Sequence, residues 1–171
     1  MTYLRLLLIS PLIAISSAAW ANWGETRWDS SPEEVLAALG EGTQTKEDSE
    51  GSRVWDQHFL IEQRGEYQGF PVLQEFYFKK GESLSVVRIN LIAETDCSDF
   101  VNAAQAQFDE PIDSEQSSFE PFTVYRWDFA DREAGNVMRL ANFAIGDEEN
   151  RESISCHLIF QPFGKGQPGE R

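Results

Sequence analysis

Apolar and polar side chains alternate along several stretches of this chain, and this pattern constrains the fold more than any other feature. In VWDQHFLIEQR, Trp55, Phe59 and Ile61 fall on one face, while His58 and Glu62 fall on the other. A period of two is typical of a strand with one buried face. Further strands are predicted in QEFYFKK, LSVVRINLI, FTVYRWDF, NVMRLANFAI and SISCHLIF. Short turns separate them, which favours antiparallel hairpins over parallel crossovers.

The stretch SSPEEVLAALGEG predicts the first helix. Ser31 can cap the N-terminus, and Glu34 completes a capping box three residues later. Pro32 suits the first helical position, and Gly40 suits a left-handed stop. We therefore expect a short helix from Pro32 to Leu39.

A second helix is predicted in TDCSDFVNAAQAQFDEP. Phe100, Ala104 and Phe108 recur at every fourth position, so they share one helical face. Pro111 then ends the helix, because proline has no backbone N–H to continue it.

The order of these elements predicts an internal duplication. The chain runs helix, about three strands, helix, about three strands, with a period of about 65 residues. We predict an α+β fold of two helix-then-antiparallel-meander units, 31–92 and 95–161. The two units would pack as one domain over 22–161, with the helices on one sheet face and the other face partly exposed to water.

Two known families share features with this pattern. SSPEEVLAALGEG resembles the helix-opening motif of the SmpA/OmlA-type outer-membrane assembly lipoproteins. The twofold helix-then-sheet layout looks like the beta-lactamase inhibitory protein-like architecture, whose members bind other proteins in the bacterial envelope or outside the cell. The lipoprotein cysteine is missing here. The resemblance implies a non-enzymatic, protein-binding module.

The N-terminal stretch MTYLRLLLISPLIAISSAAWA has the layout of a secretory signal peptide. Arg5 precedes a short apolar run, and small residues lead to Ala19-Trp20-Ala21. The run is shorter than the roughly 20 residues that a membrane span needs. We expect cleavage after Ala21, a secreted or periplasmic protein without a stable membrane anchor, and a disordered tail over 162–171. An N-terminal anchor is the alternative.

The chain is strongly acidic. Lysine and arginine number 14 against 29 aspartates and glutamates, which gives a formal net charge of −15. Such a charge repels phosphate backbones and argues against a nucleic-acid partner. It favours a basic protein partner, whose approach it would steer, or it serves solubility alone.

The stretch SISCHLIF holds Cys156 and His157 side by side. Strand side chains alternate, so Cys156 shares the apolar face with Leu158 while His157 points the opposite way. This argues against a nucleophile with its base, or a pair of metal ligands, at these two positions. Two cysteines in a secreted protein most often pair, so we expect a disulfide between Cys97 and Cys156. A free structural thiol and a catalytic or metal-binding cysteine are the alternatives.

No other pattern in the sequence points to a catalytic residue, a metal site or a cofactor. The histidines and cysteines lack the short spacing of zinc-ligand pairs. Asp56 and His58 would lie about 7 Å apart on one strand face, too far for an orienting hydrogen bond. No G-x-S-x-G elbow is present. We expect a protein that is not an enzyme; a small hydrolase or small-ligand carrier with a pocket between helices and sheet is the alternative.

Tryptophan and tyrosine offer the remaining candidates for function. These residues dominate binding hot spots, which makes an aromatic surface one interpretation. The other is packing, in which the N-terminal arm folds onto the sheet. The candidate surface residues are Trp23, Trp28, Tyr67, Tyr77, Tyr125 and Trp127.

Overall fold

The computed structural model describes residues 22–49, 53–54, 56–92, 97–108, 110–132, 135–146 and 152–163. The predicted signal peptide lies outside the described residues, as do Trp55 and positions 164–171 of the predicted tail.

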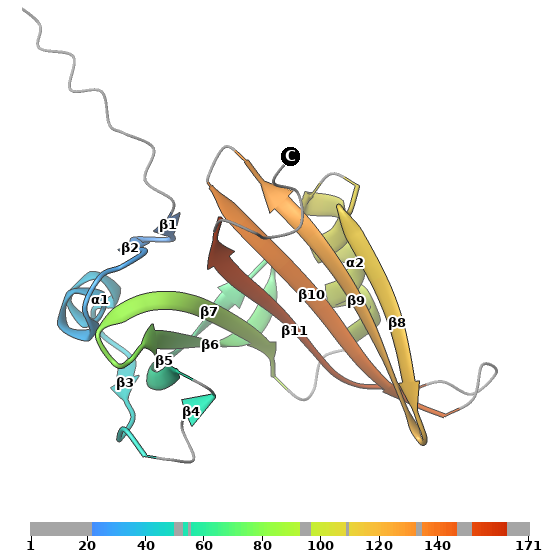
Figure 1. The fold of residues 1–171 in the computed structure, drawn as a ribbon, viewed down its shortest axis with the longest axis horizontal. Helices are drawn as coiled ribbons and strands as arrows, with labels where there is room; N and C mark the ends of the chain where they lie inside the picture. The colour runs from blue at the N-terminus through green and yellow to red at the C-terminus, as the bar shows by residue number, and fades with distance from the viewer. Residues whose placement is uncertain are drawn as a thin grey trace, which may run out of the picture.

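One antiparallel sheet dominates the fold (Figure 1). Its strands are β3 (Thr43–Thr45), β4 (Arg53–Val54), β5 (Gln57–Tyr67), β6 (Phe70–Lys79), β7 (Ser83–Leu91), β8 (Asp113–Phe119), β9 (Phe122–Asp131), β10 (Asn136–Ile145) and β11 (Glu152–Pro162). They lie in the order β3-β5-β6-β7-β11-β10-β9-β8, and β4 pairs with β5. The two runs of strands meet where Val87 to Asn90 pair with Phe160 to His157.

The prediction of two helix-then-meander units is wrong. The helices are short, α1 (Pro32–Leu39) and α2 (Cys97–Gln107), and the strands form one continuous sheet. Pairing of β7 with β11 creates this continuity, and no local pattern in either strand reveals it. The expected three strands per run were also too few. The sequence DSEQSSF of β8 has no apolar alternation, because all seven of its side chains are exposed.

The predicted start and end of α1 are confirmed. The Ser31 hydroxyl accepts a hydrogen bond from the Glu34 backbone N–H at 3.3 Å, and the Ser31 backbone N–H donates to the Glu34 carboxylate at 2.9 Å. This capping box satisfies two backbone donors that have no partner within the helix. Gly40 follows with a φ of 70°, a left-handed conformation that glycine adopts without strain.

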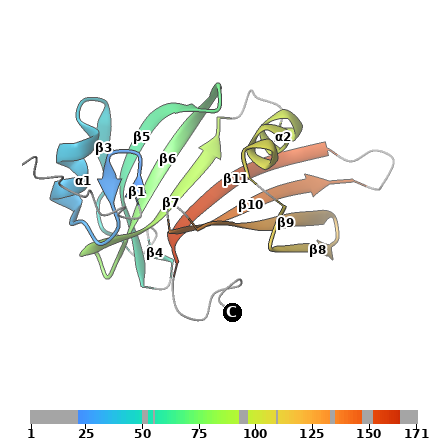
Figure 2. The same ribbon diagram turned by 90° about the horizontal axis from the view of Figure 1, so that it is seen from above.

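The hydrophobic core lies on one face of the sheet, which we call the core face. Its largest fully buried side chains from the strands are Ile61, Phe76, Phe78, Leu84, Ile89, Phe129, Met138, Leu140 and Leu158. Val35 of α1 and Phe100 of α2 join the same cluster, so both helices cover this face. Figure 2 shows α2 next to β11, and α2 contacts both β11 and β10.

The N-terminal arm adds to the cover of the core face. It forms a hairpin of β1 (Asn22–Trp23) and β2 (Thr26–Arg27). The ring of Trp23 lies 4.2 Å from that of Phe160, measured between centroids, and its indole N–H donates to Gln74 at 3.1 Å. The arm is therefore packed against the sheet.

A disulfide joins α2 to the sheet. Cys97 is the first residue of α2, and Cys156 lies on the core face of β11, with 5.7 Å between their α-carbons. The predicted pairing of these two cysteines is confirmed. It fixes the N-terminal end of α2 over the strand that joins the two halves of the sheet.

Candidate functional site

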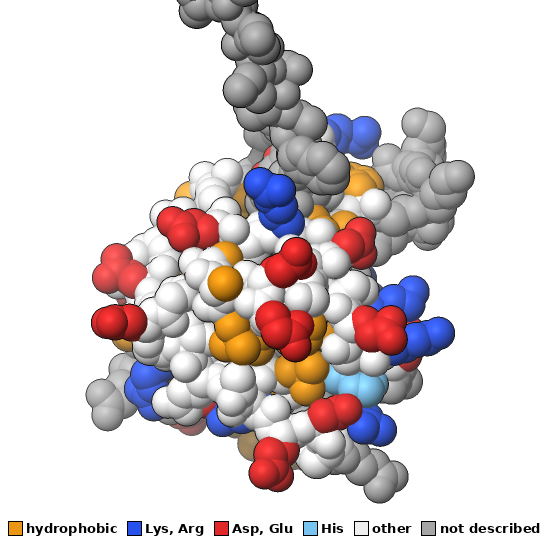
Figure 3. Space-filling view, turned by 90° about the vertical axis from the view of Figure 1, so that its left-hand side faces the viewer, with side chains coloured by type: hydrophobic (Ala, Val, Ile, Leu, Met, Phe, Trp, Pro, Cys, Tyr) orange, Lys and Arg blue, Asp and Glu red, His pale blue; other side chains and the backbone are white. Residues whose placement is uncertain are grey.

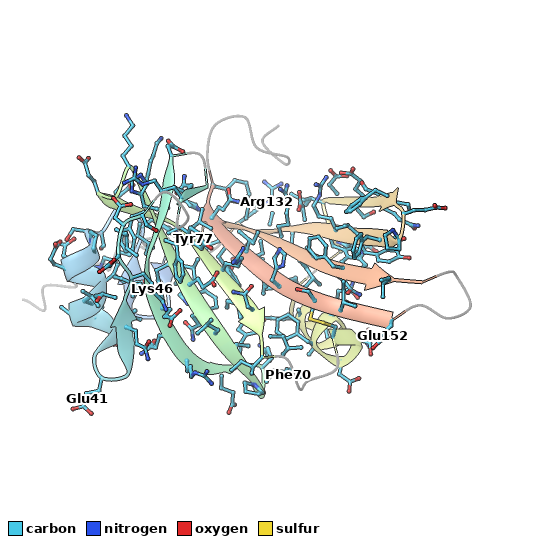
Figure 4. The ribbon with its side chains drawn as sticks, turned by 90° about the horizontal axis from the view of Figure 1, so that it is seen from below. Glu41, Lys46, Phe70, Tyr77, Arg132 and Glu152 are labelled. Carbon is cyan, nitrogen blue, oxygen red and sulfur yellow. A yellow bond between two sulfur atoms is a disulfide. The ribbon has the colours of Figure 1, made fainter. Side chains whose placement is uncertain are left out.

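The opposite face of the sheet, which we call the outer face, carries the side chains that alternate with those of the core. Its central residues are Glu75, Tyr77, Arg88, Asn90, Glu115, Arg126, Asp128, Arg139, His157 and Ile159. Both helices and the N-terminal hairpin pack on the core face, so within the described residues no helix covers the outer face. Figure 4 views the molecule from the side opposite Figure 2, with Tyr77 labelled.

Glu75, Tyr77 and Arg88 form a cluster near the middle of the outer face. One carboxylate oxygen of Glu75 accepts hydrogen bonds from the Arg88 guanidinium at 2.7 Å and from the Tyr77 hydroxyl at 3.0 Å. The Arg88 guanidinium also lies 5.5 Å from the centre of the Tyr77 ring, within cation–π range. Burial raises the pKa of Tyr77 to about 12, although Arg88 acts against this shift. The hydroxyl therefore stays protonated and keeps donating.

Arg139 and Asp128 form a second cluster on the same face. The guanidinium donates two hydrogen bonds of 2.7 Å, one to each carboxylate oxygen. Asp128 is only 2 % exposed, whereas the Arg139 side chain remains partly open to solvent. The hydrogen bonds to Asp128 raise the pKa of Arg139. In the neighbouring row of cross-strand partners, Arg126 forms an ion pair with Glu115 of β8.

His157 lies on β11 beside these two clusters, in the row of cross-strand partners next to the one that holds Arg88 and Arg139. Its ring packs against Phe143, with 5.5 Å between centroids. Burial lowers the pKa of His157 from 6.5 to about 4, Arg88 lowers it further, and Glu75 opposes the shift. The imidazole is therefore neutral at physiological pH and can donate at one nitrogen and accept at the other.

This lowered pKa predicts a specific acid sensitivity. The unfolded chain takes up a proton on His157 near pH 6.5, whereas the folded protein resists protonation until about pH 4. Stability linked to this group is therefore present above pH 6.5 and is lost as the pH falls through 4. We expect the difference in free energy of unfolding between wild type and His157→Gln to change by about 3 kcal/mol across this window, at about 1.4 kcal/mol for each unit of pKa. Urea titrations at several pH values measure it; a constant difference would contradict the prediction.

A groove of about 480 Å³ opens on the outer face beside His157. It lies beyond the last residue pair that joins β7 to β11, Asn90 with His157. The groove is lined by Arg88, Asn90, Phe119, Phe122, Phe143, Ile154, Ser155 and His157. Phe119 is 55 % exposed and Ile154 is 51 % exposed, and both line this groove, so their apolar surfaces are presented together. The groove therefore offers apolar contact area beside polar hydrogen-bonding groups.

The aromatic residues predicted as a binding surface do not form one surface. Trp23 and Tyr67 pack with Phe160 on the core face, and the indole N–H of Trp28 donates to Asn136 at 2.8 Å. These residues follow the packing interpretation.

Only one of the remaining aromatic candidates reaches the outer face. Tyr125 and Trp127 stack at 6.1 Å on the core face of β9, and Tyr77 alone lies on the outer face. The sequence did not lead us to predict the groove phenylalanines or the paired arginines as part of the site. The alternation of side chains along β6 could have revealed part of this site, because it buries Phe76 and Phe78 on one face and turns Glu75 to the other.

The structure also locates the residues considered for catalysis. His58 Nδ1 lies 3.1 Å from an oxygen of Asp48, which in turn accepts hydrogen bonds from Arg53. Asp56, considered as its partner, is exposed. Among the described residues, no group of three or more His, Cys, Asp or Glu side chains could hold a metal ion. None of the described helices has the length and apolar character to cross a membrane.

No protein-family model, curated protein or solved structure matches this chain. The resemblance to the SmpA/OmlA-type and beta-lactamase inhibitory protein-like proteins stays a prediction that these comparisons do not test.

Proposed function

We propose that this protein is a non-enzymatic, protein-binding module of the periplasm or the extracellular space, and that its outer face contacts the partner. The observation that carries the proposal is a broad sheet face without a covering helix among the described residues, which carries paired arginines and a groove lined by phenylalanines. Arginine is enriched at interface hot spots, and phenylalanine at interface cores. Inhibition, immunity and envelope assembly are functions of this kind.

The hydrogen bonds of the outer face favour binding. Glu75 holds Arg88, and Asp128 holds Arg139 through two parallel hydrogen bonds. Long side chains that are already fixed lose less conformational freedom when a partner binds. The exposed apolar side chains Phe119 and Ile154 supply surface whose burial favours association. Fixed polar groups around an apolar patch are the usual anatomy of a protein interface.

Charge supports a basic partner. The formal net charge is −15, yet Arg88, Arg126 and Arg139 of the outer face are each paired with a carboxylate. Excess acid lies elsewhere: the first turn of α1 carries two glutamates, and its last turn carries no basic residue. Figure 3 shows acidic side chains spread over the end of the molecule near α1. The net field would attract a basic protein, and the outer face, where these three arginines are paired, would make the contact.

The secretory signal peptide predicted over residues 1–21 supports a partner in the envelope or outside the cell. The Cys97–Cys156 disulfide fits an oxidising compartment, because disulfides persist there and are rare in the cytosol. The source organism's envelope and extracellular fractions are therefore the appropriate material for finding the partner.

A capture experiment with matched variants tests the proposal. Immobilised protein is exposed to those fractions at low and at high salt, as wild type, as Phe119→Asp with Ile154→Asp, and as Ile112→Asp. Ile112 is the matched control, because it is apolar and 38 % exposed but lies beside the C-terminal end of α2. We expect wild type and Ile112→Asp to retain the same protein at low salt, with less at high salt.

The groove variant separates the outer face from other surfaces. Two charges placed in the groove should reduce capture about tenfold or more, as expected when a hot spot is lost. Circular dichroism confirms that each variant is folded. Undiminished capture by the groove variant, or loss of capture in Ile112→Asp alone, would show that the partner binds elsewhere.

A further inference from the structure

Strand β8 is the long free edge of the sheet. It pairs with β9 along Asp113–Phe119, and among the described residues no strand lies on its other side. All seven of its side chains are exposed. At the opposite edge the strands β3 and β4 are only three and two residues long. A free edge presents backbone N–H and C=O groups that an added strand can pair with.

The side chains of β8 separate into two sets. Asp113, Glu115, Ser117 and Phe119 lie on the outer face, as their cross-strand partners show: Asp113 faces Asp128, Glu115 faces Arg126, and Phe119 faces Phe122. The other set is Ser114, Gln116 and Ser118, which are polar and uncharged. An added strand would therefore meet charge and apolar surface on the outer face only.

Charge is unbalanced at one end of β8. Arg139 is paired with Asp128, and Asp113 stands directly across from Asp128, so this row holds two carboxylates and one guanidinium. The next row, Arg126 with Glu115, is balanced. A cation on an added strand opposite Asp113 would balance the first row, because side chains on adjacent strands lie about 5 Å apart.

Apolar surface lies at the other end of β8. Phe119 is 55 % exposed, its ring lies 5.7 Å from that of Phe122, and both line the groove beside His157. A large apolar side chain on an added strand opposite Phe119 would cover this ring. Phe119 is six positions from Asp113, an even spacing that keeps both on one face.

We propose that an extended segment of a partner protein adds to β8 as a further strand, with a cation facing Asp113 and a large apolar side chain facing Phe119, six residues apart. This inference rests on the proposed function, because it names the segment of the partner that the outer face and its edge receive. A second copy of β8 fits poorly, because DSEQSSF contains two acids and no cation.

Synthetic peptides test this mode with the full chain. The probe is a nine-residue peptide in which one arginine and one phenylalanine stand six positions apart among threonines, made in both orders to allow parallel and antiparallel pairing. One control has a spacing of five, which turns one of the two side chains to the other face. A second control carries N-methyl groups on the backbone, which remove hydrogen-bond donors without changing charge.

We expect fluorescence anisotropy to show binding of one order of the six-spaced peptide, about tenfold tighter than the five-spaced peptide. N-methylation should abolish this binding, and hydrogen exchange should slow at the β8 amides. Asp113→Asn should weaken it about twofold to fivefold and reduce its salt dependence. Equal binding of the N-methylated peptide, indifference to spacing, or no binding of either order would overturn the inference.

The capture experiment distinguishes this inference from the proposed function. If a partner is retained through the groove but neither order of the peptide binds, strand addition fails and the outer face stands as the contact. If the peptide binds but no partner is retained by wild type at low salt, β8 accepts strands and the proposed outer-face function fails. Formation of dimers by the protein alone, with slowed exchange at β8, would overturn the inference in favour of a second copy.

Discussion

Replacing both Cys97 and Cys156 by alanine should lower the free energy of unfolding by about 4 kcal/mol. The disulfide joins residues 59 positions apart, and closing so long a loop removes much conformational freedom from the unfolded chain. It also fixes the start of α2 over the core face, where Phe100, Val101 and Ala104 are buried. Urea denaturation followed by tryptophan fluorescence and by circular dichroism measures the loss.

Reduction separates the cross-link from the loss of side-chain volume. Reductant should destabilise wild type by most of the same amount and leave the double alanine variant unchanged. A loss below about 1 kcal/mol in both experiments would mean that the disulfide contributes little and that packing alone holds α2 in place.

Arg139→Met should cost about 3 kcal/mol of folding free energy. The variant leaves the Asp128 carboxylate, only 2 % exposed, without the two hydrogen bonds that compensate its burial. The estimate is the lower end of the range for broken buried pairs, because the Arg139 side chain is itself 37 % exposed. Chemical denaturation of the purified variant measures the change.

An exposed pair provides the matched control for Arg139. Arg53 bonds Asp48 through two nitrogens, as Arg139 bonds Asp128, but both partners are open to solvent. Arg53→Met should therefore cost less than about 1 kcal/mol. Adding Asp128→Asn to Arg139→Met should restore part of the stability, because the buried charge is then gone. Equal losses for the two arginine variants would contradict the burial argument.

Local patterns predicted the local structure. The capping box of Ser31 and Glu34 defines α1, and alternation identifies the central strands. The prediction that Phe59 and Ile61 share a face is wrong, because a bulge between them turns Phe59 toward Tyr77 on the outer face and Ile61 toward the core. The position of Cys156 on an apolar strand face led to its pairing with Cys97. The helix cap and the strand alternation depend on residues that are close in sequence. The disulfide could be predicted because the sequence offers each of its two cysteines a single partner.

Long-range pairing could not be predicted in the same way. The contact between β7 and β11 joins Asn90 to His157, and neither strand carries a signal for its neighbour. β8 was not predicted, because an exposed edge strand buries no side chains and so needs no apolar alternation. The pairing of β7 with β11 makes the sheet continuous, and β8 forms its free edge.

The candidate site was hidden for a related reason. Arginine and glutamate in a predicted strand indicate only its solvent-exposed face. The sequence does not show which acid each arginine will face. The register pairs Arg88 with Glu75 and Arg139 with Asp128 across neighbouring strands. The tryptophans drew attention instead, yet Trp23 and Trp28 pack against the core cluster.

Site-specific photo-cross-linking of the captured complex tests the central claim, that the outer face is the contact surface, most directly. A photo-reactive residue replaces Ser155 in the groove, Ser117 on β8, or Ala37, which is exposed on α1. We predict partner adducts from positions 155 and 117 and none from position 37. Adducts from position 37 alone would contradict the claim and place the contact on the helical side of the molecule.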